Sequence, residues 1–232
     1  MSDQEPNQPS SAFDTLFSLL HDRHSCRGFL PDPVPAEQIT RIVAAAQRVP
    51  SWCNAQPWQV IVTSGMETDR FRDMLYDAAL TKQPEPDLDW PKRYTGVYQS
   101  RRRTCGLQLY DAVGVERGDR AASGQQMLEN YRLFGAPHVA IVTSESDLGP
   151  YGAMDCGGFI AAFTLAAQAL GIATIPQAAV AAFAPSLRDH FDIPQDRLIL
   201  CAISFGFEDA DHPANRFRTE RAPLDEVIDW RK

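Results

Sequence analysis

Two arginines and a serine alternate along a short stretch near the N-terminus of this 232-residue chain. They are Arg23, Ser25 and Arg27, and His24 and Cys26 separate them. In an extended segment, side chains two positions apart share a face, so the arginines and the serine point together while His24 and Cys26 point the other way. Guanidinium groups stay charged and match the oxygens of phosphate or carboxylate. The stretch predicts a site for an anion such as a phosphate-bearing cofactor, with a solvated basic turn as the alternative.

The overall charge limits the choice of partner. Lys and Arg total 22 against 30 Asp and Glu, which gives a formal net charge of −8. Binding along a nucleic-acid backbone needs a basic face, and the chain has no long basic block. The most apolar window, residues 156–175, is interrupted by Thr164 and Gln168. We therefore expect a core helix there, and neither nucleic acid nor membrane as a partner.

The N-terminus and the cysteines indicate the compartment. Residues 1–12 are polar and lack the basic start and apolar stretch of a signal peptide, so we predict a disordered leader. The 5 cysteines are scattered and form no Cys-x-x-Cys pair. This usage indicates a cytoplasmic protein with reduced cysteines rather than a disulfide framework or a zinc site.

Periodicity and turn residues predict the elements that position the arginine stretch. We expect helices over residues 13–22, 35–49, 67–80, 97–113, 123–134, 154–170 and 186–191, and strands over residues 59–63, 139–143, 172–176 and 198–205. The apolar face of the first helix should dock on the body of the protein, and Gly149-Pro150 should interrupt the chain before the long Ala-rich helix. Residues 81–134 are the least regular part and predict a lid or interface arm, and residues 208–232 predict an extended arm.

Several common catalytic motifs are absent from the sequence. There is no Gly-x-Gly-x-x-Gly after a strand, no Gly-x4-Gly-Lys-Ser/Thr and no Gly-x-Ser-x-Gly. The 5 histidines do not follow a metal-ligand spacing, and we expect no metal site. A built-in dinucleotide-binding unit, a P-loop and triad hydrolysis are therefore disfavoured.

Five segments in order resemble the nitroreductase family of FMN-dependent oxidoreductases. They read RHSCRGF, VPSWCNAQPW, FGAPHVAIV, MDCGGFIAAF and RTERAPLDEVI, and the resemblance runs from about Phe13 to Trp230. It implies an α+β fold with a mixed, mostly antiparallel sheet between helices, in a single domain over residues 13–232. It also implies a homodimer with an exchanged C-terminal arm and two FMN molecules at the subunit interface.

The same resemblance implies roles for particular residues. Arg23, Ser25 and Arg27 would hold the ribityl phosphate and the pyrimidine edge of FMN, with His24 touching the cofactor through its backbone. The other implied contacts are Pro50, Ser51, Trp52 and Asn54 from the partner chain, Pro176, Gln177, Ala178 and Ala179 along the ring, and Arg221 at the phosphate. Many family members have Glu-Gly where this chain has Gln177-Ala178, and some have Lys at the position of Thr219.

The resemblance implies an NAD(P)H-linked reductase of nitroaromatics or quinones with ping-pong turnover. No catalytic side chain is then needed, because the cofactor carries the hydride chemistry. Residues 94–103 offer Tyr94, Tyr98, Arg101, Arg102 and Arg103 for an aromatic substrate with a carboxylate, or else form a solvated helix face. Reductive dehalogenation, flavin fragmentation, flavin storage and a helical interaction module remain alternatives.

Overall fold

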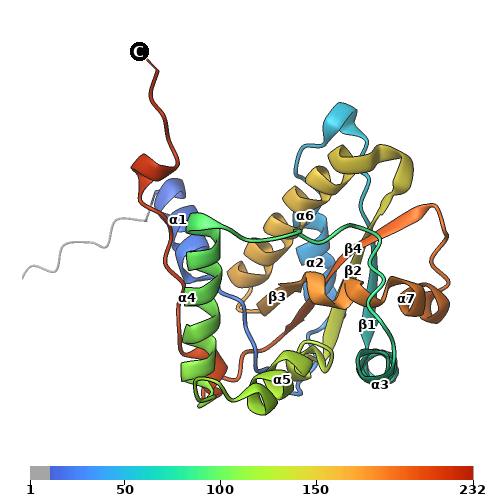
Figure 1. Cartoon of the computed structure of the whole chain (residues 1–232). Helices are drawn as coiled ribbons and strands as arrows, with labels where there is room; N and C mark the ends of the chain where they lie inside the picture. The colour runs from blue at the N-terminus through green and yellow to red at the C-terminus, as the bar shows by residue number, and fades with distance from the viewer. Residues whose placement is uncertain (1–10, 232) are drawn as a thin grey trace, which may run out of the picture.

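A four-stranded antiparallel sheet forms the centre of the molecule (Figure 1). The structure is a computed structural model and describes residues 11–231. The strands are β1 (Gln59–Ser64), β2 (His138–Glu145), β3 (Ala173–Gln177) and β4 (Arg197–Gly206), in the order β1-β2-β4-β3. All four predicted strands are therefore confirmed, with ends that differ by one or two residues. This order leaves β3 with a free edge.

Helices cover both faces of the sheet. The α-helices are α1 (Ala12–Asp22), α2 (Ala36–Ala46), α3 (Met66–Thr81), α4 (Gly96–Ala112), α5 (Arg120–Leu128), α6 (Gly149–Ala169) and α7 (Ala184–Phe191). Helices α3 and α7 pack on one face, and α2 and α6 pack on the other. Among residues 11–231, no helix is long and apolar enough to cross a membrane.

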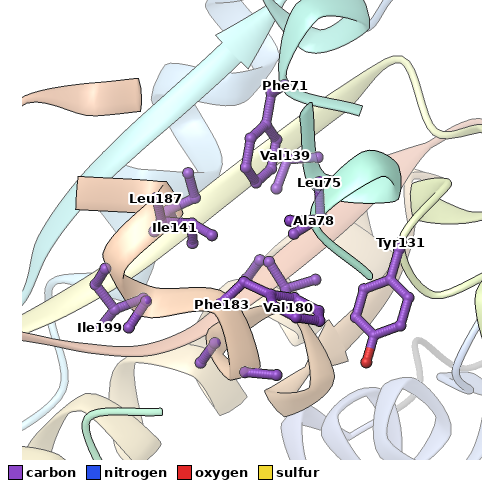
Figure 2. Close-up of a cluster of buried hydrophobic side chains, with 14 of the residues drawn as sticks. Phe71, Leu75, Ala78, Tyr131, Val139, Ile141, Val180, Phe183, Leu187 and Ile199 are labelled. Atoms are coloured by element: carbon purple, nitrogen blue, oxygen red, sulfur yellow. The ribbon is translucent and has the colours of Figure 1, made fainter. Parts of the chain in front are cut away.

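The alternation of side chains along β2 builds two separate cores. Val139 and Ile141 point to the core under α3 and α7, where Phe71 and Leu187 also lie (Figure 2). Ala140 and Val142 point to the opposite core under α2 and α6. Because neighbouring residues of a strand face opposite ways, a strand covered on both sides must be apolar at every position. The continuous apolar run of β2 follows from this arrangement.

A third group of elements lies beside this sandwich. Helix α1, helix α4 and the C-terminal segment lie together at one side of the molecule (Figure 1). The prediction that α1 docks its apolar face on the body is wrong for this chain by itself, because Phe13, Leu16, Phe17 and Leu20 are all exposed. Neither α1 nor α4 has a buried residue. We call α1, α4 and residues 208–231 the arm.

Several predicted helix boundaries are also wrong: α2 ends at Ala46 rather than 49, α5 begins at Arg120 rather than 123, and the largest differences are the start of α6 and the end of α5. Helix α6 begins at Gly149, because proline is well accommodated in the first turn of a helix, and Pro150 occupies that turn. Helix α5 ends at Leu128, before a turn in which Leu133 and Phe134 have positive φ values of 59° and 52°. A residue in that conformation cannot continue a right-handed helix.

The predicted leader covers residues 1–12, of which 1–10 lie outside the described residues. Ser11 and Ala12 belong to α1, because the Ser11 hydroxyl accepts a hydrogen bond from the Asp14 N–H at 3.0 Å and the Asp14 carboxylate returns one to Ser11. This reciprocal capping box fixes the start of the helix at Ala12. The assignment of Ser11 and Ala12 to a leader is therefore wrong.

Candidate active site

A cavity of about 600 Å³ opens where the body meets the arm. Four arginines line it: Arg23, Arg27, Arg218 and Arg221. The other lining residues are Leu20, His21, Asp22, His24, Ser25, Cys105, Gln168, Glu208, Phe217 and Thr219. The fold thus brings Arg221 from the end of the chain to the predicted arginine stretch near its start. The volume lies in the usual range for cofactor sites.

The arginine stretch is extended because it bonds to segments on both sides. Ser25 forms a parallel bridge with Thr174 on the free edge of β3, and the Cys26 N–H donates to the Thr174 carbonyl at 3.1 Å. On the other side, the Leu30 N–H donates to the Phe207 carbonyl at 2.9 Å. An edge strand offers unpaired backbone groups to such a partner. The predicted extended conformation is therefore confirmed.

Cys26 points away from the cavity, as the alternation predicts. Its side chain is fully buried, and the thiol donates to the Gly28 carbonyl at 3.1 Å. Burial is the main cause that raises the pKa of Cys26 to about 12, so the thiol remains protonated and unreactive. His24 lies at the cavity with its imidazole Nε2 3.1 Å from a carboxylate oxygen of Glu208.

The cavity carries uncompensated positive charge. Within residues 11–231, none of its four arginines has a carboxylate within ion-pair distance, while the lining carboxylates Asp22 and Glu208 each lie against a histidine. Burial and then the charge of Arg221 lower the pKa of Arg23, and burial lowers the pKa of Arg27. A bound anion reverses both effects, because opposite charge stabilises the protonated guanidinium.

The arginines are held mainly by main-chain carbonyls. Arg27 donates through Nη1 to the Ser25 carbonyl at 3.1 Å and lies 5.8 Å from the centre of the Phe217 ring. Arg218 donates to the Asn215 carbonyl at 2.7 Å, and Arg221 donates to the Thr219 carbonyl at 3.1 Å. These contacts use part of each guanidinium's set of five N–H donors, so further donors stay available to an anion.

The loop with Pro50, Ser51, Trp52 and Asn54 does not line this cavity in the single chain. The Trp52 side chain is 65% exposed, and its ring centre lies 5.1 Å from that of Tyr151. The loop is attached to helix α6, since the Trp52 N–H donates to the Asp155 carboxylate at 3.0 Å. It is therefore an ordered, outward-facing surface, which a contact with a second chain requires.

The predicted ring-contact residues, Pro176 to Ala179, lie at the end of β3 and the start of a 3₁₀ turn, Ala178–Phe183. The Gln177 side chain is 3% exposed. Its amide accepts from the Ser204 hydroxyl at 2.6 Å and donates to the Asn130 carbonyl at 2.9 Å. The side chain is thus bound in the interior, and a contact between Gln177 and a ligand can use only the main chain.

The predicted substrate residues lie on or just before α4, outside the cavity. Arg101 forms an ion pair with Glu226 of the C-terminal segment at 2.7 Å, and the Arg102 guanidinium lies 5.3 Å from the centre of the Tyr94 ring. Tyr98 is 65% exposed. Helix α4 nevertheless borders the cavity, because Cys105 lines it.

Sequence reasoning missed several of the lining residues. Arg218 is the first residue of the segment RTERAPLDEVI, three positions before Arg221. Because both are arginines in one short segment, the sequence could have indicated Arg218 as a second anion-binding residue there. Gln168, Cys105 and Glu208 carry no local signal, because α6, α4 and the segment after β4 meet at the cavity only through the tertiary fold.

Comparison with known proteins agrees with this arrangement. Residues 20–207 match the family model described as "Nitroreductase family". Nitroreductase NfnB of Mycolicibacterium smegmatis is 35% identical over 212 residues, which cover 90% of this chain and 89% of that protein. A 4-nitrobenzoate reductase of Nocardioides sp. is 31% identical, with 94% of this chain and 90% of that protein covered.

A solved structure gives the same result for the fold. The crystal structure of the FMN-dependent nitroreductase NfnB from Mycobacterium smegmatis in complex with NADPH superposes with a TM-score of 0.91 and 32% identity, covering 95% of this chain and 99% of that chain. The α+β sandwich with a cationic cavity beside a helical arm is the nitroreductase type of fold. The chain belongs to the nitroreductase family, and the fold expected from the resemblance is confirmed.

Proposed function

We propose that this protein is an FMN-dependent oxidoreductase that uses NADPH to reduce nitroaromatic compounds. The observation that carries the proposal is the cavity with four arginines and no carboxylate paired to them in the described residues. A phosphate with nearly two negative charges compensates this excess. Relatives support the choice of ligand, since the solved neighbours include FMN-dependent and NADPH-dependent nitroreductases.

The residues present fit FMN. The family resemblance implies that Arg23, Ser25 and Arg27 hold the phosphate and the pyrimidine edge of the ring and that Arg221 holds the phosphate. Arg218, which lines the same cavity, would add a further contact to the phosphate. FMN, when bound, supplies the hydride transfer. The partly buried Arg27 guanidinium would stabilise negative charge at the pyrimidine edge, because charges interact more strongly where solvent is partly excluded. The chain's own contribution is therefore binding, orientation and electrostatic stabilisation.

The complete site is proposed to need two chains. Trp52 and its loop face outward, α1 exposes four large apolar residues, and the C-terminal segment exposes Leu224, Val227, Ile228 and Trp230. Exposed apolar patches of this extent are typical of interfaces. A homodimer that exchanges the C-terminal segment would bury these surfaces and bring Pro50, Ser51, Trp52 and Asn54 to the partner's cavity. Light scattering of the FMN-loaded protein tests this: a monomer that retains FMN contradicts the shared site.

Turnover is proposed to be ping-pong. NADPH and the nitro compound would occupy the same position in turn, as the family resemblance implies. Quinones of similar size are expected as alternative oxidants. All five cysteines are free, which supports a cytoplasmic location. Parallel lines in double-reciprocal plots at several NADPH concentrations are expected, and intersecting lines would contradict the ping-pong order.

The first experiment is spectroscopic. The purified protein should bind FMN, and NADPH should bleach the 450-nm region flavin band under anaerobic conditions, with recovery when 4-nitrobenzoate is added. Arg27→Leu should bind FMN weakly, whereas Arg48→Leu, a matched loss of an arginine outside the cavity, should bind it as the wild type does. Absence of FMN binding by the wild type would end the cofactor proposal, and binding without bleaching would leave a flavin-storage protein.

The role of α4 in substrate choice is a separate proposal. A benzoate carboxylate would compete with Glu226 for Arg101, because the two groups offer the same fork of acceptors to the guanidinium. Arg101 and Arg102 should be replaced one at a time by glutamine, with Tyr94→Phe and Tyr98→Phe beside them. Turnover of 4-nitrobenzoate should fall more than turnover of nitrobenzene. Equal losses on both substrates would contradict the carboxylate clamp.

A further inference from the structure

One buried asparagine joins the two walls of the cavity. Asn215 ends a 3₁₀ turn, Pro213–Asn215, and is 3% exposed. Its carboxamide oxygen accepts from the Arg27 N–H at 2.6 Å. Its Nδ2 group donates to the Gly28 carbonyl at 2.9 Å and to the Asp209 carbonyl at 2.9 Å. All three partners of the carboxamide are main-chain groups, whose character as donor or acceptor is fixed. They therefore determine which way the oxygen and the Nδ2 group of Asn215 point.

The main chain of the same residue holds the other wall. The Asn215 carbonyl accepts from the Arg218 guanidinium at 2.7 Å. Asn215 therefore contacts the backbone of one cavity arginine and the side chain of another. Both Arg27 and Arg218 line the cavity, whereas Asn215 itself does not.

The chemistry at this position admits few residues. An N–H must be met by an acceptor and two carbonyls must be met by donors. A carboxamide presents one acceptor and two donors on a short, planar group. An ionised carboxylate offers acceptors only. An apolar side chain leaves the Arg27 N–H without its acceptor in a buried place and removes one donor from each carbonyl, so that Gly28 keeps only the Asp209 N–H and the Cys26 thiol, and Asp209 keeps only the His212 N–H.

We propose that Asn215 is a positioning residue of the flavin site: it fixes the main chain at Arg27–Gly28 and so sets the direction of the Arg27 guanidinium towards the cavity. This inference rests on the proposed function, since the readout is FMN binding. Cofactor contacts need placement within about half an ångström. A residue that aims Arg27 thus governs flavin affinity without touching the flavin.

The test compares Asn215→Ala with a control that removes buried hydrogen bonds elsewhere. Thr68 is 1% exposed, and its hydroxyl bonds to Thr63 Oγ1 at 2.9 Å and to the Pro137 carbonyl at 3.0 Å, outside the cavity. Stability of the FMN-free proteins is measured by urea unfolding, and the Kd of FMN by quenching of flavin fluorescence. Asn215→Ala should raise the Kd about tenfold or more, whereas Thr68→Val should leave it within about twofold at a similar loss of stability.

Two results separate the proposals. If the wild type binds no FMN, the proposed function and this inference fall together. If the wild type binds FMN and Asn215→Ala binds it equally well, or Thr68→Val weakens binding as much, this inference alone is overturned.

Asn215→Asp keeps the test decisive should the alanine variant not fold. The ionised carboxylate still accepts from the Arg27 N–H, but its second oxygen faces the Gly28 and Asp209 carbonyls as another acceptor and repels them, and protonation restores one donor. The ratio of variant to wild-type Kd should therefore fall as the pH is lowered from 7.5 to 5.5. A general structural defect gives a ratio independent of pH, and a constant ratio would overturn the positioning role.

Discussion

The two walls of the cavity are held in different ways. The wall with Arg23 and Arg27 bonds to β3 on one side and to residues 207–215 on the other, and its Cys26 and Gly28 are buried. The wall with Arg218 and Arg221 is exposed, and within residues 11–231 the Arg221 side chain donates only to Thr219 and Glu220, its own neighbours in sequence. One wall is part of the body, and the other belongs to the arm.

This difference indicates how an anion site is completed. The body wall is pre-organised, so ligand binding does not have to order it. The arm wall is ordered mostly by local contacts, so part of the binding energy is spent on fixing it. Substitutions of the cavity-lining arginines in the body wall should therefore weaken binding more than comparable substitutions in the arm wall.

The largest effect is expected at Gly28. A Cβ at this position would lie 2.3 Å from Cγ of His212, far inside contact distance. Gly28→Ala forces the segment around His212 away from the body wall, at a cost of about 3 kcal/mol in the free energy of unfolding. Urea unfolding and FMN binding should both show the loss.

A second substitution checks the cause. His212→Gly removes both the ring and the Cβ, which would lie 2.5 Å from the added methyl group, so the Gly28→Ala/His212→Gly double variant should recover most of the stability that the single variant loses. Independent effects of the two substitutions, adding within about 0.5 kcal/mol, would mean that the collision is not the reason.

The next effect separates the two faces of the arginine stretch. Arg27→Leu should weaken FMN binding by about 10- to 100-fold, since a charged hydrogen-bond partner contributes about 1.5–3 kcal/mol. Cys26→Ala removes a buried thiol one position away and should leave the Kd within about threefold. The two values are compared by titration of the FMN-free proteins, and similar Kd values for the two variants would refute the alternation of faces.

The sequence alone predicted which side chains of the body wall share a face, but it did not predict the residue that supports this wall. Alternation of Arg23, Ser25 and Arg27 predicted which side chains share a face, because an extended segment leaves one choice. The role of Asn215 could not be predicted, because its carboxamide bonds to the main chain of Arg27, 188 positions away, and no local sequence pattern marks such a contact. The direction of α1 was also beyond prediction: Phe13 and Phe17 have helical spacing, but the spacing does not say which surface covers them.

A smaller effect is expected from His138, which supports the chain after the body wall. Its Nε2 accepts from the Val34 N–H at 2.9 Å, and Nδ1–H donates to the Thr63 carbonyl at 3.1 Å, so the ring is neutral. Burial lowers the pKa of His138 below its ordinary 6.5. The unfolded chain then binds a proton that the folded chain does not, and stability should fall below pH 6.5 by up to about 1.4 kcal/mol per pH unit.

His138→Gln tests this assignment. A glutamine amide can accept from Val34 and donate to Thr63 but does not titrate. The variant should lose the part of the acid sensitivity between pH 6.5 and 5 that depends on His138, as measured by urea unfolding at each pH. An unchanged slope would place the sensitivity elsewhere.

The smallest effect is expected where the arm wall is attached to α4. The ion pair between Arg101 and Glu226 spans 2.7 Å, but the two side chains are 47% and 50% exposed. Exposed pairs contribute less than about 1 kcal/mol and are screened by salt. Glu226→Gln should therefore change the Kd of FMN by less than about threefold at low salt, and the difference should vanish at 0.5 M NaCl.

Glu220→Gln makes the same change of charge in the same segment without removing an ion pair of the described residues. Subtracting its effect leaves the contribution of the pair itself. A tenfold loss in Glu226→Gln alone would mean that this single contact fixes the arm, and the contrast between a pre-organised wall and a loosely attached one would have to be abandoned. A small, salt-sensitive loss is the result expected if the body wall is the main determinant of flavin affinity and the arm wall contributes less.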